Sequence, residues 1–266
     1  MKILVSNDDG IDSAGLLNLV SALASEHRIY VCAPDSQRSG TGHGITITHP
    51  VTVTEVDIPL AKKSYMMSGT PADCVKMGID LLADDGIEID MVFSGINNGG
   101  NLGTDTLYSG TVSAALEGSV CGLPAVAVSV NALAPKHYEL ATALALRASR
   151  LDFASIDDKL VLNINVPNLP PEEVKGVKVT GLGMREYYNW KVRSADEAGR
   201  VTLSYAGDPI HYEGLDSDAN DVGASQHGYA TVTPIHFDLT CYSLIDKVRA
   251  SGIADSADGV SSDTSP

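Results

Sequence analysis

The sequence predicts an α/β protein in which helices flank a mostly parallel β-sheet. Apolar runs and helical patterns alternate over roughly the first 130 residues, the order typical of a parallel sheet covered by helices. Residues 2–6 form a short apolar run, which suits a strand buried on both faces. The chain has 266 residues, 44% of them hydrophobic, so it can bury one large core.

Local signals place the elements of the first half in order. After the strand at 2–6, Ser13 caps a helix expected at 14–25, whose apolar residues share one face. Thr70 and Pro71 start a second helix, with an acid three residues after the capping threonine. This second helix is expected to end at residue 83, and two further helices at residues 120 and 150. The other expected strands are 28–33, 51–56, 90–94 and 125–130.

The second half is less regular. Residues 189–193 and 201–205 flank a polar turn and predict a β-hairpin extension over about 185–210. Its low apolar content indicates that it projects from the body or pairs with another subunit. We expect a single domain over 1–250 and a disordered acidic tail over 251–266, where Ser, Asp, Ala and Gly dominate. Further strands are expected at 160–166 and 229–233.

Composition excludes several function classes. The net charge of −16 argues against binding to a nucleic-acid duplex, which needs a basic patch. We expect no membrane segment, because no run approaches the ~20 apolar residues that span a bilayer. The start of the chain turns polar at Asn7 and lacks a signal peptide, so we expect a cytoplasmic protein. The four cysteines form no CxxC pair, which favours buried free thiols.

Asp8 and Asp9 directly follow the first expected strand. An Asp-Asp-Gly sequence can be a turn with solvated acids, but unneutralised charge beside a buried strand is costly. A hard divalent cation removes that cost, since Mg²⁺ and Mn²⁺ prefer oxygen ligands. Ser39 and Asn97 follow other strands and can supply neutral oxygens to the same ion. The sequence therefore predicts a metal site at the carboxyl edge of the sheet.

Two further segments are candidates for a phosphate site. Gly40 and Thr41 begin a glycine-rich loop that can cradle a phosphate, although it lacks the spacing of known phosphate motifs and, taken alone, is more often a flexible connection. Ser109, Gly110 and Thr111 open a helix, whose N-terminal N–H groups attract anions even on an acidic protein. Plain capping by Ser109 is the alternative.

Five stretches of the sequence carry a resemblance to a known family. In chain order they are residues 3–10 (ILVSNDDG), 33–40 (APDSQRSG), 68–75 (SGTPADCV), 94–103 (SGINNGGNLG) and 108–115 (YSGTVSAA). A looser match follows at residues 228–234 (GYATVTP). Together, and in this order, these stretches resemble the SurE survival-protein family of 5′/3′-nucleotidases.

The resemblance implies a Rossmann-like fold and a phosphomonoesterase acting on nucleotides. It implies one divalent cation per subunit, Mg²⁺ or Mn²⁺, held by Asp8, Asp9, Ser39 and Asn97. It also implies homodimers or homotetramers that exchange the hairpin and the C-terminal segment. The residues that it places against the phosphate are Asn101, Ser109, Gly110 and Thr111.

The expected function is hydrolysis of nucleoside 5′-monophosphates, with 3′-monophosphates left open. Our hypothesis is that the metal lowers the pKa of a water molecule, which attacks phosphorus beside the catalytic residues Asp8 and Asp9. A covalent aspartyl intermediate is the alternative mechanism, but the enzymes that use it place their acids as Asp-x-Asp. The rival from another class is a non-catalytic nucleotide or phosphate sensor.

Overall fold

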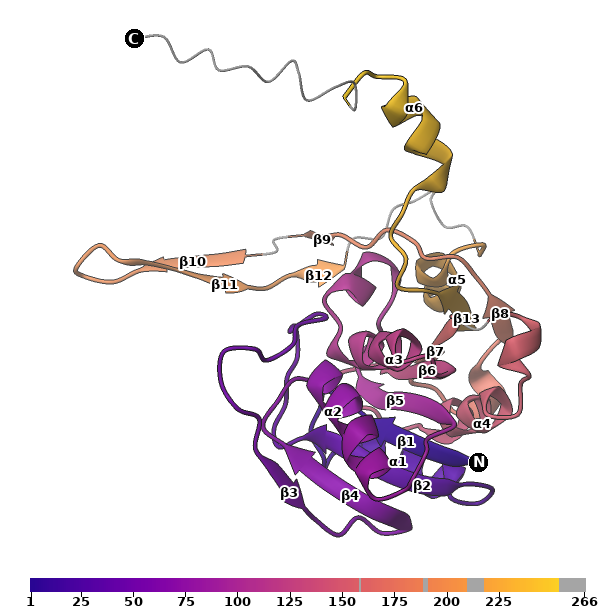
Figure 1. Cartoon of the computed structure of the whole chain (residues 1–266). Coiled ribbons are helices and arrows are strands. Elements are labelled where there is room, and N and C mark those ends of the chain that lie inside the picture. Colours follow the sequence, from indigo (N-terminus) through magenta and orange to yellow (C-terminus); the bar gives the residue numbers. More distant parts are fainter. Residues whose placement is uncertain (158, 189–190, 210–217, 254–266) are drawn as a thin grey trace. The chain divides into compact units, whose positions relative to one another are not determined.

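The computed structural model describes residues 1–157, 159–188, 191–209 and 218–253. A nine-stranded sheet in the order β3-β4-β2-β1-β5-β6-β7-β13-β8 organises the described chain (Figure 1). Its strands are β1 Lys2–Ser6, β2 Arg28–Pro34, β3 Val53–Glu55, β4 Ala61–Met67, β5 Met91–Asn98, β6 Ala125–Asn131, β7 Val161–Pro167, β8 Val177–Val179 and β13 Ala230–Ile235.

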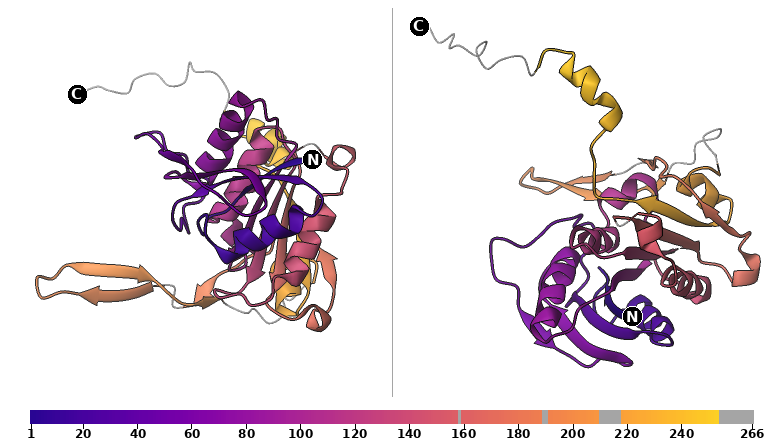
Figure 2. Two further views of the ribbon diagram at one scale, coloured as in Figure 1. Left: turned by 90° about the horizontal axis from the view of Figure 1, so that it is seen from below. Right: turned by 45° about the vertical axis from the view of Figure 1, so that its right-hand side comes forward.

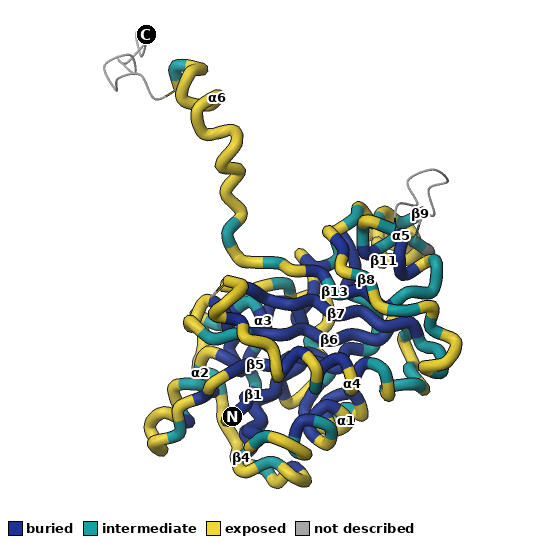
Figure 3. Tube along the Cα trace, turned by 90° about the vertical axis from the view of Figure 1, so that its right-hand side faces the viewer, coloured by how far each residue is buried: buried dark blue, intermediate teal, exposed yellow. Residues whose placement is uncertain are grey.

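The centre of the sheet is parallel and its margins are mixed. Strands β4, β2, β1, β5, β6 and β7 run parallel, whereas β3 pairs antiparallel with β4 and β13 pairs antiparallel with β7. Strands β1, β5 and β6 at the centre are buried on both faces, as the burial map shows (Figure 3). The predicted α/β class with a mostly parallel sheet is confirmed.

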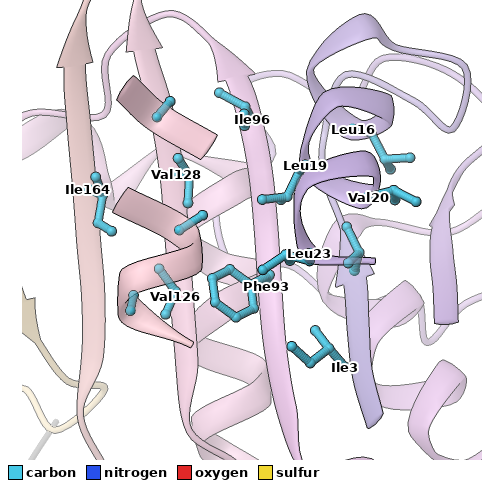
Figure 4. Packing of buried hydrophobic residues seen from close by; sticks show 14 of the residues in the cluster. Ile3, Leu16, Leu19, Val20, Leu23, Phe93, Ile96, Val126, Val128 and Ile164 are labelled. Atoms are coloured by element: carbon cyan, nitrogen blue, oxygen red, sulfur yellow. The ribbon is translucent and has the colours of Figure 1, made fainter. Parts of the chain in front are cut away.

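Four helices cover the two faces of this sheet. Helix α1 Ala14–Leu23 and helix α4 Glu139–Ala148 pack on one face, and helix α2 Pro71–Asp84 and helix α3 Gly110–Val120 pack on the other. On the first face, Leu16, Leu19 and Leu23 of α1 are fully buried near strand residues such as Phe93 (Figure 4).

Both predicted caps are present. The Ser13 hydroxyl accepts from the Leu16 N–H, as expected for the cap of α1. The side chain of Thr70 and that of Asp73 form the reciprocal capping box of α2. These local hydrogen bonds satisfy helix N–H groups that have no partner within the helix.

Strand β5 is longer than the sequence predicted. We expected it to stop at residue 94, but it continues through Asn98 with a register shift against β6 between Gly95 and Asn97. A Cβ on Gly95 would lie 2.3 Å from the Val128 carbonyl oxygen, so only glycine permits this close approach. Asn97 and Asn98 are therefore fixed by the sheet rather than held in a loop.

Other differences lie away from the centre of the sheet. β4 has no counterpart among the expected strands, and the strand expected at 51–56 is reduced to the three residues of β3. Cys121 and Cys241 are exposed, so the prediction that all the thiols are buried is wrong for these two, while Cys32 and Cys74 are buried. Cys121 is the C-cap of α3, in the turn that leads to β6.

The predicted hairpin consists of β10 Lys191–Ala195 and β11 Val201–Tyr205, which pair antiparallel (Figure 2). Every residue of both strands is exposed. A second short ladder joins β9 Tyr187–Tyr188 to β12 Asp208–Pro209. Residues 189–190, where we expected the first strand to begin, lie outside the described part of the chain.

The remaining elements are short. Residues Met1–His236 form one compact unit, and a second unit begins at Phe237. Most of the tail expected at 251–266 lies outside the described residues. No helix of the described ranges is both long and apolar enough to cross a bilayer. The short helices are η1 Gly103–Leu107, η2 Phe153–Ser155, η3 Pro171–Glu173 and α5 Asp221–Gln226 in the first unit, and η4 Tyr242–Leu244 and α6 Ile245–Arg249 in the second.

Candidate active site

The carboxyl ends of β2, β1 and β5 lie side by side in the sheet. Asp8 and Asp9 follow β1, Ser39 follows β2, and Asn97 lies near the end of β5. Because parallel strands end at the same edge, the sheet brings these four positions to one edge, as their places after separate strands predicted. We call these four residues the carboxylate centre.

Asp8 is almost fully buried, with 4% of its surface exposed. The Thr111 hydroxyl donates to its Oδ1 at 2.5 Å, and the backbone N–H groups of Gly110 and Thr111 also approach the carboxylate. Burial raises the pKa of Asp8 above its ordinary value, while these hydrogen bonds lower it. The N-terminus of α3 is thus aimed at Asp8, where its partial positive charge favours the ionised carboxylate.

Gly110 is required for this approach. A Cβ at that position would lie 2.7 Å from the Cβ of Asp8 and 3.0 Å from the Cγ of Pro71. The absence of a side chain lets the first turn of α3 rest directly against the Asp8 carboxylate. Gly110 therefore acts through backbone contact with Asp8 in this structure.

Asp9 is half-buried and more accessible than Asp8. The Asn98 N–H donates to its Oδ2 at 3.0 Å, and the Gln37 amide lies 3.5 Å from its Oδ1. Burial raises the pKa of Asp9, and the neighbouring charge of Asp8 raises it further. Among the described residues, no lysine, arginine or histidine forms an ion pair with either acid.

Ser39 and Asn97 stand on either side of Asp9. Ser39 is exposed, and Gln37 donates to its hydroxyl at 2.9 Å, so one amide reaches both Ser39 and Asp9. The side-chain amide N–H of Asn97 donates to the Gly99 carbonyl at 2.7 Å, which leaves its amide oxygen as the possible metal ligand. Sequence reasoning missed Gln37 and Asn98, although both lie inside the motifs that it used.

The residues predicted to contact phosphate are in different situations. Ser109 accepts from the Val112 N–H at 3.0 Å, so its hydroxyl serves as the cap of α3. Asn101 is buried and donates from its side chain to the Ser129 hydroxyl at 2.9 Å. Gly40 and Thr41 lie in an exposed loop, in which Thr41 donates to the Arg38 carbonyl at 2.9 Å. The glycine loop is near the start of α3, because Gly42 donates to the Tyr108 carbonyl at 3.1 Å.

Comparison with known proteins gives a consistent result. The profile of the family described as "Survival protein SurE" matches residues 3–189. A "5'-nucleotidase SurE" of Syntrophomonas wolfei is 43% identical over 253 residues, which are 94% of this chain and 94% of that protein. A protein of the same name from Pelotomaculum thermopropionicum is 44% identical over 250 residues, again 94% of each chain. The solved SurE protein of Aquifex aeolicus superposes with a TM-score of 0.79 at 36% identity, covering 94% of this chain and 99% of that one.

Proposed function

The chain belongs to the SurE family and is a nucleotide phosphomonoesterase, and we propose that its reaction takes place at the carboxylate centre. The substrate is a nucleoside 5′-monophosphate, and the products are the nucleoside and inorganic phosphate. The observation that carries this assignment is the pair of carboxylates, Asp8 and Asp9, which are desolvated at a strand end and form no ion pair with a cationic side chain of the described residues.

The donor set fits a hard divalent cation. Two carboxylates, a hydroxyl and an amide oxygen are the ligand types that Mg²⁺ and Mn²⁺ prefer. Asp8, Asp9, Ser39 and Asn97 would hold one such ion per subunit. Its charge would offset the burial of the two acids and supply the local positive potential that a protein of net charge −16 needs to bind a phosphate.

The mechanism assigns separate tasks to the residues of the chain. When bound, the cation supplies Lewis-acid stabilisation of the phosphoryl oxygens and lowers the pKa of the attacking water. Thr111 and the start of α3 donate hydrogen bonds that favour the ionised form of Asp8 and fix its orientation. The Asn98 N–H and the Gln37 amide hold the carboxylate of Asp9, the more accessible acid. Direct attack by water is favoured over an aspartyl nucleophile because Asp8 and Asp9 are adjacent, whereas the enzymes that form an aspartyl intermediate place their acids as Asp-x-Asp.

The test measures phosphate release from 5′-AMP and from p-nitrophenyl phosphate. We expect turnover with Mg²⁺ or Mn²⁺ and its loss in EDTA, restored when the metal is returned. Tight binding of 5′-AMP without metal-dependent turnover would instead identify a nucleotide sensor. A rapid acid quench that traps no phosphorylated enzyme would support direct attack by water over the aspartyl intermediate.

We also propose that the enzyme assembles as a homodimer or homotetramer and acts in the cytoplasm. Apolar residues on the exposed hairpin support the assembly, since Val192 and Leu203 are each 57% exposed. Light scattering on the purified chain measures the subunit number. A monomer at micromolar concentration would contradict the assembly, and cell fractionation tests the location.

A further inference from the structure

A cavity of about 620 Å³ lies beside the start of α3. This volume falls within the roughly 300–1,000 Å³ typical of small-molecule sites. We call it the tyrosine pocket. It is lined by Gly40, Asp105, Tyr108, Tyr187, Tyr205, Ala206 and Gly207.

The tyrosine pocket adjoins the carboxylate centre along the chain at two points. Gly40 directly follows Ser39, and Tyr108 directly precedes Ser109, the cap of α3. The hydrogen bond from Gly42 to the Tyr108 carbonyl joins these two segments. A phosphate ester held between Ser39 and α3 would therefore have its remaining part near this pocket.

The walls of the pocket suit a flat and uncharged group. Three of the lining residues are tyrosines, and the described lining includes no lysine or arginine. Tyr108 is 67% exposed, so much of its side chain is open to contact with a ligand. Aromatic rings stack on nucleobases of any sequence, because every base presents a π-face. The one acid of the described lining, Asp105, is paired with Arg185, so this wall carries little net charge.

One wall is held rigidly and connected to β5. The Tyr187 hydroxyl donates to the Asp105 carboxylate, and Arg185 pairs with the same carboxylate at 2.9 Å. Arg185 also donates to the Gly100 carbonyl at 3.2 Å, in the segment that follows β5. Pre-organised aromatic walls improve affinity, since binding then orders fewer side chains.

From these observations we infer that the tyrosine pocket is the nucleoside subsite of the enzyme, where the base stacks on tyrosine while the phosphate occupies the carboxylate centre. This inference rests on the proposed function and adds the origin of its substrate preference. It accounts for selection of nucleotides over aliphatic phosphate esters, which have no ring to stack.

The test compares two substrates and three variants. For Tyr108→Ala, we expect KM for 5′-AMP to rise about tenfold, a loss in the range found when a base loses one aromatic partner. kcat/KM for glycerol 3-phosphate, which has no base, should be unchanged. Tyr108→Phe should restore the wild-type KM because it keeps the ring. Tyr188→Ala is the matched control, since Tyr188 is a neighbouring exposed tyrosine outside the described lining.

Equal effects of Tyr108→Ala on both esters, or no effect on 5′-AMP, would overturn the inference. A second measurement separates this failure from failure of the proposed function. If the wild type released phosphate from neither ester, the proposed function would be wrong, and binding of adenosine by equilibrium dialysis would then decide the subsite. Weaker adenosine binding by Tyr108→Ala supports it, and equal binding rejects it.

Discussion

The carboxylate centre and the tyrosine pocket are adjacent, but the fold holds them in different ways. Asp8 is 4% exposed and is bound by the first turn of a helix packed on the sheet, whereas Tyr108 is 67% exposed. The centre lies at the ends of parallel strands, and the pocket is closed by residues 205–207, at the end of an exposed hairpin strand. Under the two proposals, the buried region carries the chemistry and the exposed region carries the choice of substrate.

This difference makes the effects of substitution separable. Changes in the carboxylate centre should lower kcat for every phosphate ester, because the proposed function places the reaction of all esters there. Changes in the tyrosine pocket should raise KM only for substrates with a base. A substitution in one region that produced the kinetic effect expected of the other would show that the two regions act as one.

The largest effect is expected from Asp9→Asn. The amide keeps the shape but removes a charge that would neutralise the cation, so kcat should fall by roughly 10²–10³-fold, the range seen when one charge-stabilising group is lost. The loss should be the same for 5′-AMP and glycerol 3-phosphate. Because burial and Asp8 both disfavour the charge at position 9, the variant should remain folded without metal.

Thermal unfolding supplies the second readout for this variant. A ligand that binds only the folded protein raises the unfolding temperature, so added Mn²⁺ should stabilise the wild type more than Asp9→Asn. A variant with near-wild-type kcat and an unchanged response to Mn²⁺ would remove Asp9 from the metal site.

A smaller effect is expected from Thr111→Val, which removes the hydroxyl that donates to Asp8. Partners that orient a metal ligand typically contribute 10–100-fold in activity or metal affinity, so we expect a loss of about that size. Thr111→Ser is the control, since it retains the hydroxyl. The measurement is kcat as a function of Mg²⁺ concentration, and equal behaviour of the Val and Ser variants would contradict a role for the hydroxyl.

Much of the fold and the centre could be predicted because their signals are local. The apolar run of β1, the Ser13 cap and the Thr70–Asp73 box are each contained within a few residues. The convergence of Asp8 and Asn97 then follows from a general property of parallel sheets. What holds Asp8 could not be predicted in the same way, because Thr111 lies 103 residues along the chain.

Other features depend on contacts that no local pattern contains. β4 includes two adjacent lysines, Lys62 and Lys63, and its strand conformation comes from pairing with β2 and β3. The side chain of Asn101 turns inward to Ser129 on β6, which its place in a glycine-rich motif did not indicate. The tyrosine pocket joins Tyr108 to Tyr205, residues from the two halves of the chain.

A buried acid links the two compared regions. Glu117 of α3 accepts from His43 of the glycine loop at 2.8 Å and from Lys76 of α2 at 2.8 Å. These partners lower the pKa of Glu117 below its ordinary value of 4.5, with His43 the larger cause. Glu117 thereby ties the loop that begins at Gly40, on the wall of the tyrosine pocket, to the helix that holds Asp8.

The smallest effect is therefore expected from Glu117→Gln, which removes the charge but keeps the size. We expect a loss of about 1 kcal/mol of stability at neutral pH, roughly 2–4 °C in Tm, because both partners remain partly solvated. Since the folded-state pKa of Glu117 is lowered, its stabilisation is present above pH 4.5 and is lost as the pH falls through the lowered pKa. The stabilities of the variant and the wild type should therefore converge in acid.

The same substitution should raise KM for 5′-AMP a few-fold with kcat retained, because the loop, not the carboxylate centre, is loosened. Glu26→Gln, which breaks the exposed pair with Arg150, is the control and should change neither quantity. A fall in kcat for glycerol 3-phosphate in Glu117→Gln would show instead that the loop and the centre are coupled, and that the separation of chemistry from substrate choice is incomplete.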